Sequence, residues 1–347
     1  MIFPHWLLSL TNLVQFELCD CIKCQYLPPL DQFPSLKIIE LYGLDCLEHI
    51  SDSERDNSDS LFYPSLEKLK ICGCPNLKGW WRGRRDSLPS FPRLSYLHIR
   101  ACPQLTSFPL FPYLETLWLL NCSLKQSLER MMINNKTSSG NLPSIASSSS
   151  SPSTIVAPLS KLSSMWIQDT KEGLPEECLP NLISLRSLYL EKCPLPQGMR
   201  YLTALQHLKV GVSEEVYDWD EMEWQGLRTL LSLKFYSLLK LVSLPMGLQY
   251  VSSLQKLNIT GCPSLIAIPE WICKLISLQS LEILICPKLE SLPNGIRDLT
   301  SLQTLEIQAC PILLKRCKKQ IGEDWHKISH IPNLVLYPNP QQEEPGI

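Results

Sequence analysis

The side chains best suited to chemistry in this 347-residue chain are its 15 cysteines, 6 histidines and scattered carboxylates. A CxCxxC cluster begins at Cys19, and Cys310, Cys317, His326 and His330 could in principle surround zinc. Neither group has the paired spacing of a known zinc site. The chain also lacks a GxSxG nucleophile elbow and a carboxylate pair whose local spacing suits acid–base work. We therefore expect no catalytic residue, metal, cofactor or small-molecule substrate, although a fold alone never excludes chemistry.

Most of the cysteines instead recur at one place in a repeated pattern. Leu254, Leu257, Ile259 and Cys262 spell LxxLxLxxC, and the pattern returns twice at a spacing of 24 residues. A fixed period in the twenties is typical of a leucine-rich repeat, in which each unit adds one short strand to a horseshoe. Sliding the pattern along the chain finds about twelve irregular units. The predicted fold is an α/β leucine-rich-repeat solenoid with a parallel sheet on its concave side.

Each unit should have a strand half and a turn half. The alternation of Leu257, Asn258 and Ile259 points two apolar side chains inward and the middle one to the opposite face. A proline follows the cysteine, as in CPSLIAIP from Cys262 to Pro269, and predicts an irregular turn rather than a second strand. The convex side should therefore consist of loops and short helical turns. A cysteine in one internal slot is best explained as a small buried hydrophobe, which favours a reducing compartment.

The pattern and its interruptions give the expected organisation of the chain. We expect the solenoid over residues 1–314, with polar insertions at 51–60 and 137–154, the second of which is rich in serine. Residues 315–337 should form a C-terminal cap, with an amphipathic helix around Lys315 to Lys319 and a closing segment, followed by a disordered tail over 338–347. The first repeat has no such cap and should expose apolar surface.

Charge and hydropathy exclude several classes of partner. The formal net charge is −2, from 32 basic and 34 acidic residues, so nothing draws the whole chain to nucleic acid or anionic lipid. No apolar run approaches the roughly 20 residues that span a membrane, and the first residues lack the features of a signal peptide. We expect a soluble, cytoplasmic protein, with nuclear entry left open, that binds another protein and neither nucleic acid nor membrane.

The residue between the two inward side chains of each strand predicts a row on the concave face. In chain order the row reads Glu17, Glu40, Lys70, His98, Trp118, Trp166, Tyr189, Lys209, Lys234, Asn258, Glu282 and Glu306. Aromatic side chains gather in its middle, where strands about 4.8 Å apart would set them side by side. Exposed Trp and Tyr beside cations are typical of an interface hot spot. The predicted protein-binding residues are Tyr96, His98, Trp118, Trp166, Tyr189, Lys209, Lys234 and Tyr236.

One alternative concerns these residues, and two other segments could also contact a partner. The aromatic side chains could stack on one another beneath the serine-rich insertion, which enters between the repeats of Trp118 and Trp166. The segment from Gly79 to Arg85, GWWRGRR, could contact bases, but a surface loop or a basic contact to an acidic protein fits a nearly neutral chain better. The acidic segment from Glu214 to Glu223 is interpreted as a solvated loop that could also dock a basic patch.

Several stretches carry a family resemblance. These are the CPxLxxLP repeat ends, LPQGMRYLTALQHL from Leu195, MEWQGLRTLLSLKF from Met222 and, most specifically, CPILLKRCKKQIGEDWHKISHIPNL from Cys310. They resemble the C-terminal leucine-rich-repeat region of plant coiled-coil nucleotide-binding leucine-rich-repeat disease resistance proteins. The resemblance implies a domain that senses a pathogen effector or a guarded host protein, or that holds a nucleotide-binding domain inactive.

The chain also departs from that family. No GxxxxGK[ST] phosphate-binding loop occurs, so we expect only the sensor half of such a receptor, encoded alone or cut from a longer product. A rival reading is the substrate-binding repeat domain of a ubiquitin ligase adaptor, which would need an F-box segment. An extracellular receptor would need GxIP segments, paired cysteine caps and a signal peptide. Neither set of features is present in the sequence.

Overall fold

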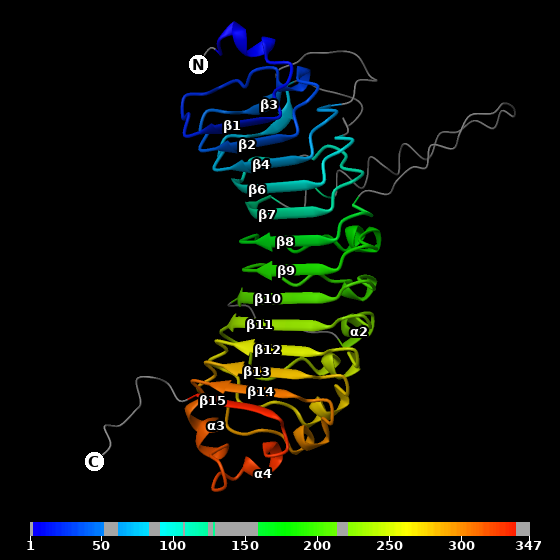
Figure 1. Cartoon of the computed structure of the whole chain (residues 1–347), viewed down its shortest axis with the longest axis vertical. Coiled ribbons are helices and arrows are strands. Elements are labelled where there is room, and N and C mark those ends of the chain that lie inside the picture. The colour runs from blue at the N-terminus through cyan, green and yellow to red at the C-terminus, as the bar shows by residue number, and fades with distance from the viewer. Residues whose placement is uncertain are drawn as a thin grey trace, which may run out of the picture. The chain divides into compact units, whose positions relative to one another are not determined.

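The computed structural model describes residues 3–51, 62–82, 91–106, 108–123, 128, 159–213 and 221–337, and it divides into two compact units, Met1–Leu185 and Arg186–Ile347. Each unit is built on a parallel sheet with one strand for every predicted repeat (Figure 1). The insertion at 137–154 and the tail at 338–347 lie outside the described residues. So does the insertion at 51–60, except that Ser51 ends a short strand.

The strands of the two units follow the chain order. In the first unit, neighbouring strands are β1 (Gln15–Cys19), β2 (Ile38–Tyr42), β4 (Lys68–Cys72), β6 (Tyr96–Cys102), β7 (Thr116–Cys122) and β8 (Ser164–Gln168). In the second unit they are β9 (Ser187–Glu191), β10 (His207–Ser213), β11 (Ser232–Leu238), β12 (Lys256–Thr260), β13 (Ser280–Leu284), β14 (Thr304–Gln308) and β15 (Asn333–Tyr337). The predicted fold class is thereby confirmed, and β15 extends the second sheet beyond the predicted repeats.

The strand register stacks equivalent residues of successive repeats. Leu257 is paired with Leu281, and Leu281 with Leu305, and all three are at most 1% exposed. Burying a leucine contributes roughly 1.5–3 kcal/mol, so these rows hold the sheet against the turn half of each repeat. The first repeat is the exception, because Phe16 and Leu18 are only half-buried. The 3-10 helix η1 (His5–Ser9) precedes them.

The turn halves contain short 3-10 helices, as predicted: η2 (Leu30–Gln32), η3 (Glu176–Asn181), η4 (Met199–Tyr201), η5 (Met246–Tyr250), η6 (Glu270–Lys274) and η7 (Asn294–Asp298). The expectation that this half never forms strands is wrong at two places. In the first unit, β3 (His49–Ser51) and β5 (Gly79–Trp81) make a second, two-stranded parallel sheet. In the second unit, Ala267 forms isolated parallel bridges to Ser243 and Ser291.

The GWWRGRR segment is not a simple surface loop. Its first three residues form β5, and Trp80 is only 1% exposed. The Trp80 ring lies 5.5 Å from the ring of Phe91 and 5.9 Å from that of Phe111, in edge-on arrangements that aromatic pairs prefer. Trp80 therefore belongs to the core of the first unit. Residues 83–85 lie outside the described residues.

Each of the twelve repeats has one residue in the left-handed backbone conformation, either directly after its strand or at the second-last position of the strand. These residues are Asp20, Gly43, Gly73, Ala101, Asn121, Asp169, Lys192, Val212, Ser237, Gly261, Ile285 and Ala309. Each stands just before the cysteine slot, where the chain leaves the sheet. The conformation costs an ordinary residue roughly 1–2 kcal/mol, and glycine and asparagine adopt it most readily. Ile285 and Val212 are β-branched, so they are the strained members of this series.

The cysteine slot is internal, and all 15 cysteines are free thiols. The Cys102 thiol donates to the carbonyls of Arg100, at 3.4 Å, and Ile71, at 3.9 Å. The Cys310 thiol donates in the same way to Gln308 and Ile283. Burial raises the pKa of the Cys122 thiol to about 11, so this thiol stays protonated at neutral pH. The predicted small buried hydrophobe is found at Cys74, Cys102, Cys193, Cys262, Cys286 and Cys310, whereas Cys21 and Cys122 of the same slot are partly exposed.

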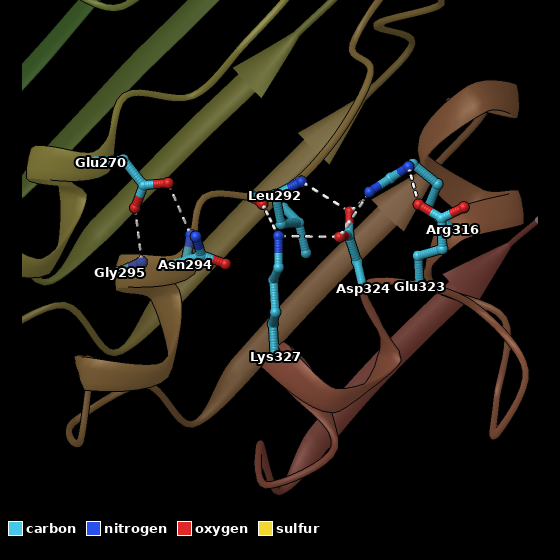
Figure 2. A network of polar contacts seen from close by, with 8 residues as sticks. All are labelled: Glu270, Leu292, Asn294, Gly295, Arg316, Glu323, Asp324 and Lys327. Atoms are coloured by element: carbon cyan, nitrogen blue, oxygen red, sulfur yellow. Dashed lines mark hydrogen bonds and ion pairs between the residues drawn. The ribbon is translucent and has the colours of Figure 1, made fainter.

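The segment after the last repeat folds against the second unit. It contains α3 (Pro311–Arg316), which begins before the expected Lys315, α4 (Trp325–Ile328) and the edge strand β15. Asp324 is 1% exposed and accepts hydrogen bonds from Arg316 and from the Leu292 amide at 3.0 Å (Figure 2). Lys327 pairs with the same carboxylate and donates to the Leu292 carbonyl. This network fixes α4 to the turn before η7.

The structure describes the last residues of the acidic segment of the second unit. Residues 214–220 lie outside the described residues, whereas α2 (Glu221–Gln225) follows directly and buries Trp224. Glu223 forms an ion pair with Arg200 at 2.6 Å. The prediction of a solvated loop is therefore wrong for residues 221–223, which lie in α2.

Candidate functional site

The predicted concave row of the first unit lies on the sheet face that points away from the core, here called the open face. The register pairs Lys70 with His98, His98 with Trp118, and Trp118 with Trp166, so these residues are direct neighbours on adjacent strands. All four are partly exposed, while their sequence neighbours are buried. The alternation that predicted the row is responsible, because successive side chains of a strand point to opposite faces.

The aromatic side chains of this row form one continuous cluster, here called the aromatic cluster: Tyr96, His98, Trp118 and Trp166. The rings of Trp118 and Trp166 are 4.8 Å apart at a tilt of 49°. The ring of His98 lies 5.3 Å from Trp118, and that of Tyr96 lies 6.3 Å from it. The first unit therefore brings together four of the predicted binding residues. The insertion that could cover them lies outside the described residues, so the covering alternative remains a prediction.

His98 has a buried nitrogen that the rest of the described chain does not satisfy. Its Nε2 atom is buried and has no hydrogen-bond partner among the described residues. Burial, and after it the charges of Lys70 and Arg100, lower the pKa of His98. The ring is therefore neutral at pH 7. A buried polar atom without a partner costs about 1–3 kcal/mol.

The cations beside the aromatic cluster are already paired. Glu40 lies 3.0 Å from Lys70 and 3.2 Å from Lys68 and accepts a hydrogen bond from Tyr42. Burial opposes its charge, but hydrogen bonds from Lys70 and Lys68 outweigh burial and lower the pKa of Glu40. Lys68 also lies 5.6 Å from the ring centre of Tyr96. Glu40 thus neutralises this part of the open face and orients its lysines.

The second unit carries the other predicted binding residues. The register pairs Tyr189 with Lys209, and Lys209 with Lys234. The ammonium of Lys209 lies 4.4 Å from the ring centre of Tyr236. Sequence reasoning missed Gly211, which is paired with Tyr236 and whose absent side chain makes room for that ring: an added Cβ would lie 2.3 Å from it. A glycine inside a predicted strand is the available signal for such a close approach.

The open face of the second unit continues into carboxylates. Asn258 is paired with Glu282, and Glu282 with Glu306. The Asn258 amide donates to the Glu282 carboxylate and its carbonyl accepts from Thr260 at 2.6 Å. Glu306 stands at the end of the row, beside Val335 of β15.

The described residues contain no group of three or more His, Cys, Asp or Glu side chains that could hold a metal ion. In that same part of the chain, no helix is long and apolar enough to cross a bilayer. Each unit presents aromatic and charged side chains on the open face of its parallel sheet. Surfaces of this composition bind proteins, with aromatic residues supplying much of the binding energy.

The parallel strands, the internal cysteine row and the 3-10 turns define a leucine-rich-repeat protein. The family model for R13L1/DRL21 leucine-rich repeats matches residues 1–44 and 243–310. The chain is 30% identical over 241 residues to a putative disease resistance RPP13-like protein 1 of Arabidopsis thaliana, covering 64% of this chain and 23% of that protein. It is 28% identical over 351 residues to a putative disease resistance protein RGA4 of Solanum bulbocastanum, covering 96% and 27%.

A solved leucine-rich-repeat protein of Leptospira interrogans aligns with a TM-score of 0.49 at 18% identity, covering 98% of this chain and 89% of that one. The chain spans about a quarter of the length of the two curated relatives. It is similar in sequence to these plant disease resistance proteins and to the R13L1/DRL21 leucine-rich repeats. The predicted resemblance is confirmed.

Proposed function

We propose that this chain is a non-catalytic protein-recognition module of plant defence. Its partner would be a pathogen effector, a host protein that the effector modifies, or a nucleotide-binding domain that the repeats hold inactive. The relatives are plant disease resistance proteins, and a stacked-repeat sheet with an open face suits protein binding. The free thiols agree with a cytoplasmic or nuclear location, which imaging of a fluorescent fusion in plant cells would test.

The aromatic cluster carries the proposal. Trp118 and Trp166 present large, rigid surfaces that lose little conformational freedom on binding, and tryptophan is enriched at hot spots. The neutral His98 packs beside them, with its ring 5.3 Å from that of Trp118. A partner that covers the cluster would gain apolar contact with the Trp118 and Trp166 rings. On the second unit, Tyr189, Lys209, Lys234 and Tyr236 are proposed as protein-binding residues in their own right.

The test replaces Trp118 and Trp166 together by alanine. A two-hybrid screen of the wild-type chain against effector and host libraries supplies interactors, which are then assayed with the purified double variant. We expect affinity to fall by about a hundredfold or more, since hot-spot residues cost at least about 2 kcal/mol each. Trp6→Ala is the matched control, because Trp6 is 63% exposed and lies outside the sheet. Undiminished binding by the double variant, with an unchanged circular dichroism spectrum, would refute the site.

A further inference from the structure

On the open face of the second unit, the basic and the acidic side chains of the central row lie on different strands. Its central row begins with two lysines, Lys209 and Lys234, continues through the neutral Asn258, and ends with two carboxylates, Glu282 and Glu306. In this row the nearest opposite charges are two strand spacings, or about 9.6 Å, apart. That distance is too long for an ion pair.

The first unit arranges the same kinds of side chain differently. There Glu40 lies within 3.2 Å of both Lys68 and Lys70, so opposite charges of its open face neutralise one another. In the second unit, Lys234 and Glu306 form no ion pair within the part of the chain that the structure describes. The contrast leaves the second unit with an electric dipole along its open face.

Neighbouring side chains of the same face add to both halves, and Glu191 of β9, paired with Gly211, places one carboxylate beside the basic half. Lys256 of β12 is exposed, forms no ion pair within the described ranges, and adds a third cation two residues before Asn258. Beside the carboxylates lie the apolar side chains of Val335 and Leu284, both partly exposed. The basic half and the acidic half thus lie on different strands of one rigid sheet (Figure 1).

We propose that the open face of the second unit binds a bipolar segment of a partner protein, with acidic residues over β10 and β11 and basic residues over β13 and β14. The two halves are centred three strand spacings, about 14 Å, apart, which an extended segment spans with about four residues. This inference rests on the proposed recognition function and names the chemistry of the partner. Opposed charges at both ends would fix the direction in which the segment lies, since a reversed segment meets like charges.

The chain's own last residues do not have this chemistry. Residues 338–347 carry Glu343 and Glu344 and no lysine or arginine, so they lack the basic half. A second copy of the chain would match the dipole in antiparallel orientation. The experiment therefore includes a measurement of dimerisation, which distinguishes a second copy of the chain from a partner segment.

The experiment uses the whole chain and two labelled peptides of one composition, read by fluorescence anisotropy at low ionic strength. The block peptide has three glutamates, four neutral residues and three lysines, and the second peptide alternates the charges. Two variants each reverse one half: Lys209→Glu/Lys234→Glu and Glu282→Lys/Glu306→Lys. A third variant combines all four substitutions and so inverts the dipole.

The matched control for charge reversal is Lys240→Glu/Lys288→Glu. Both lysines are exposed and lie in turns outside the row. Circular dichroism and thermal unfolding check that each variant is folded. Should the reversals disturb folding, Lys234→Gln and Glu306→Gln remove one charge each without introducing the opposite one.

We expect wild type to prefer the block peptide by about tenfold, and each half-reversal to remove that preference. The combined variant should bind the block peptide again, within about threefold of wild type, because a free peptide can lie in the opposite direction. The control should match wild type, and the glutamine variants should each weaken binding by about threefold. Equal binding of both peptides, or a folded combined variant that stays weak, would overturn the proposal.

Light scattering measures whether the wild-type chain forms a dimer. A wild-type dimer that either half-reversal dissociates would assign the face to a second copy and would also overturn the proposal. Because neither arm involves the aromatic cluster, a negative result here leaves the Trp118 and Trp166 experiment standing as a separate test of the proposed function.

Discussion

Asp324→Ala should destabilise the C-terminal segment more than any surface substitution. The carboxylate is 1% exposed and is approached by the Leu292 amide at 3.0 Å, Lys327 at 2.9 Å and Arg316 at 3.1 Å. Burial opposes its charge, but the hydrogen bonds from Arg316, Lys327 and Leu292 outweigh burial and hold the pKa of Asp324 below its usual range. Alanine removes the acceptor and leaves the ammonium of Lys327, which is 9% exposed, with only the Leu292 carbonyl (Figure 2).

The size of the effect follows from which contacts are buried. Arg316 is about a third exposed and can turn to water, so its contact is discounted. The contacts to the Leu292 amide and to Lys327 are buried, and hydrogen bonds to charged groups are each worth roughly 1.5–3 kcal/mol. Removing one partner of a buried ion pair typically costs about 3–5 kcal/mol. We therefore expect the free energy of unfolding of this segment to fall by about 4 kcal/mol.

Hydrogen exchange read by mass spectrometry is the suitable assay, because end segments of repeat proteins can open before the rest. Exchange in peptides covering residues 311–337 should quicken in Asp324→Ala, while peptides from β9 and β10 keep their protection. Asp324→Leu combined with Lys327→Met should recover most of the loss, since no buried charge is left alone. A loss below about 1 kcal/mol for Asp324→Ala would refute this account of the network. So would a double variant as weak as the single one.

Three further outcomes are expected. Ile285→Gly should stabilise the second unit by about 0.5–1 kcal/mol in urea unfolding, because Ile285 is left-handed and 56% exposed. The control Ile276→Gly, at a residue that is 64% exposed and has no positive φ, should not stabilise it, and a destabilised Ile285→Gly would contradict the strain. Gly211→Ala should cost about 1–3 kcal/mol and displace Tyr236, which altered tyrosine fluorescence would report; unchanged stability and fluorescence would contradict the close approach of the ring. Burial lowers the pKa of His98, so the folded state resists protonation of this ring. The contribution of His98 to stability should be complete above about pH 6.5 and should be lost as the pH falls through the pKa of the folded state. In thermal melts at pH 5 and pH 7, His98→Gln should lack this pH dependence.

The candidate site was largely predictable, since it depends on local periodicity. The register that places Trp118 beside Trp166, and Lys209 beside Lys234, follows from the repeat alignment and the two-residue period of a strand. The sequence does not predict which side chains of the row form ion pairs, which have room to pack, and which lack a hydrogen-bond partner. The pairing of Glu40 with Lys68 and Lys70, the space that Gly211 leaves for Tyr236, and the unsatisfied nitrogen of His98 depend on distances across strands.

The turn halves show where local signals fail. GWWRGRR looks polar and exposed in the sequence, yet Trp80 lies in the core because Phe91 and Phe111 from later repeats surround it. The position before the cysteine slot is left-handed whether it holds Gly261, Ala309 or Ile285, so residue type alone does not reveal it. The requirement comes from the chain leaving a shared sheet at the same point in every repeat.

Apolar periodicity is enough to predict the repeat, the number of repeat strands and the row of side chains on the open face, because it sets which face each residue takes. Tertiary structure decided which charges are neutralised and which remain apart, and how the last repeat is closed. Asp324 meets Leu292 across 32 residues of sequence, and Lys327 meets it across 35. Such contacts arise only when stacking has brought successive turns together, so no local pattern encodes them.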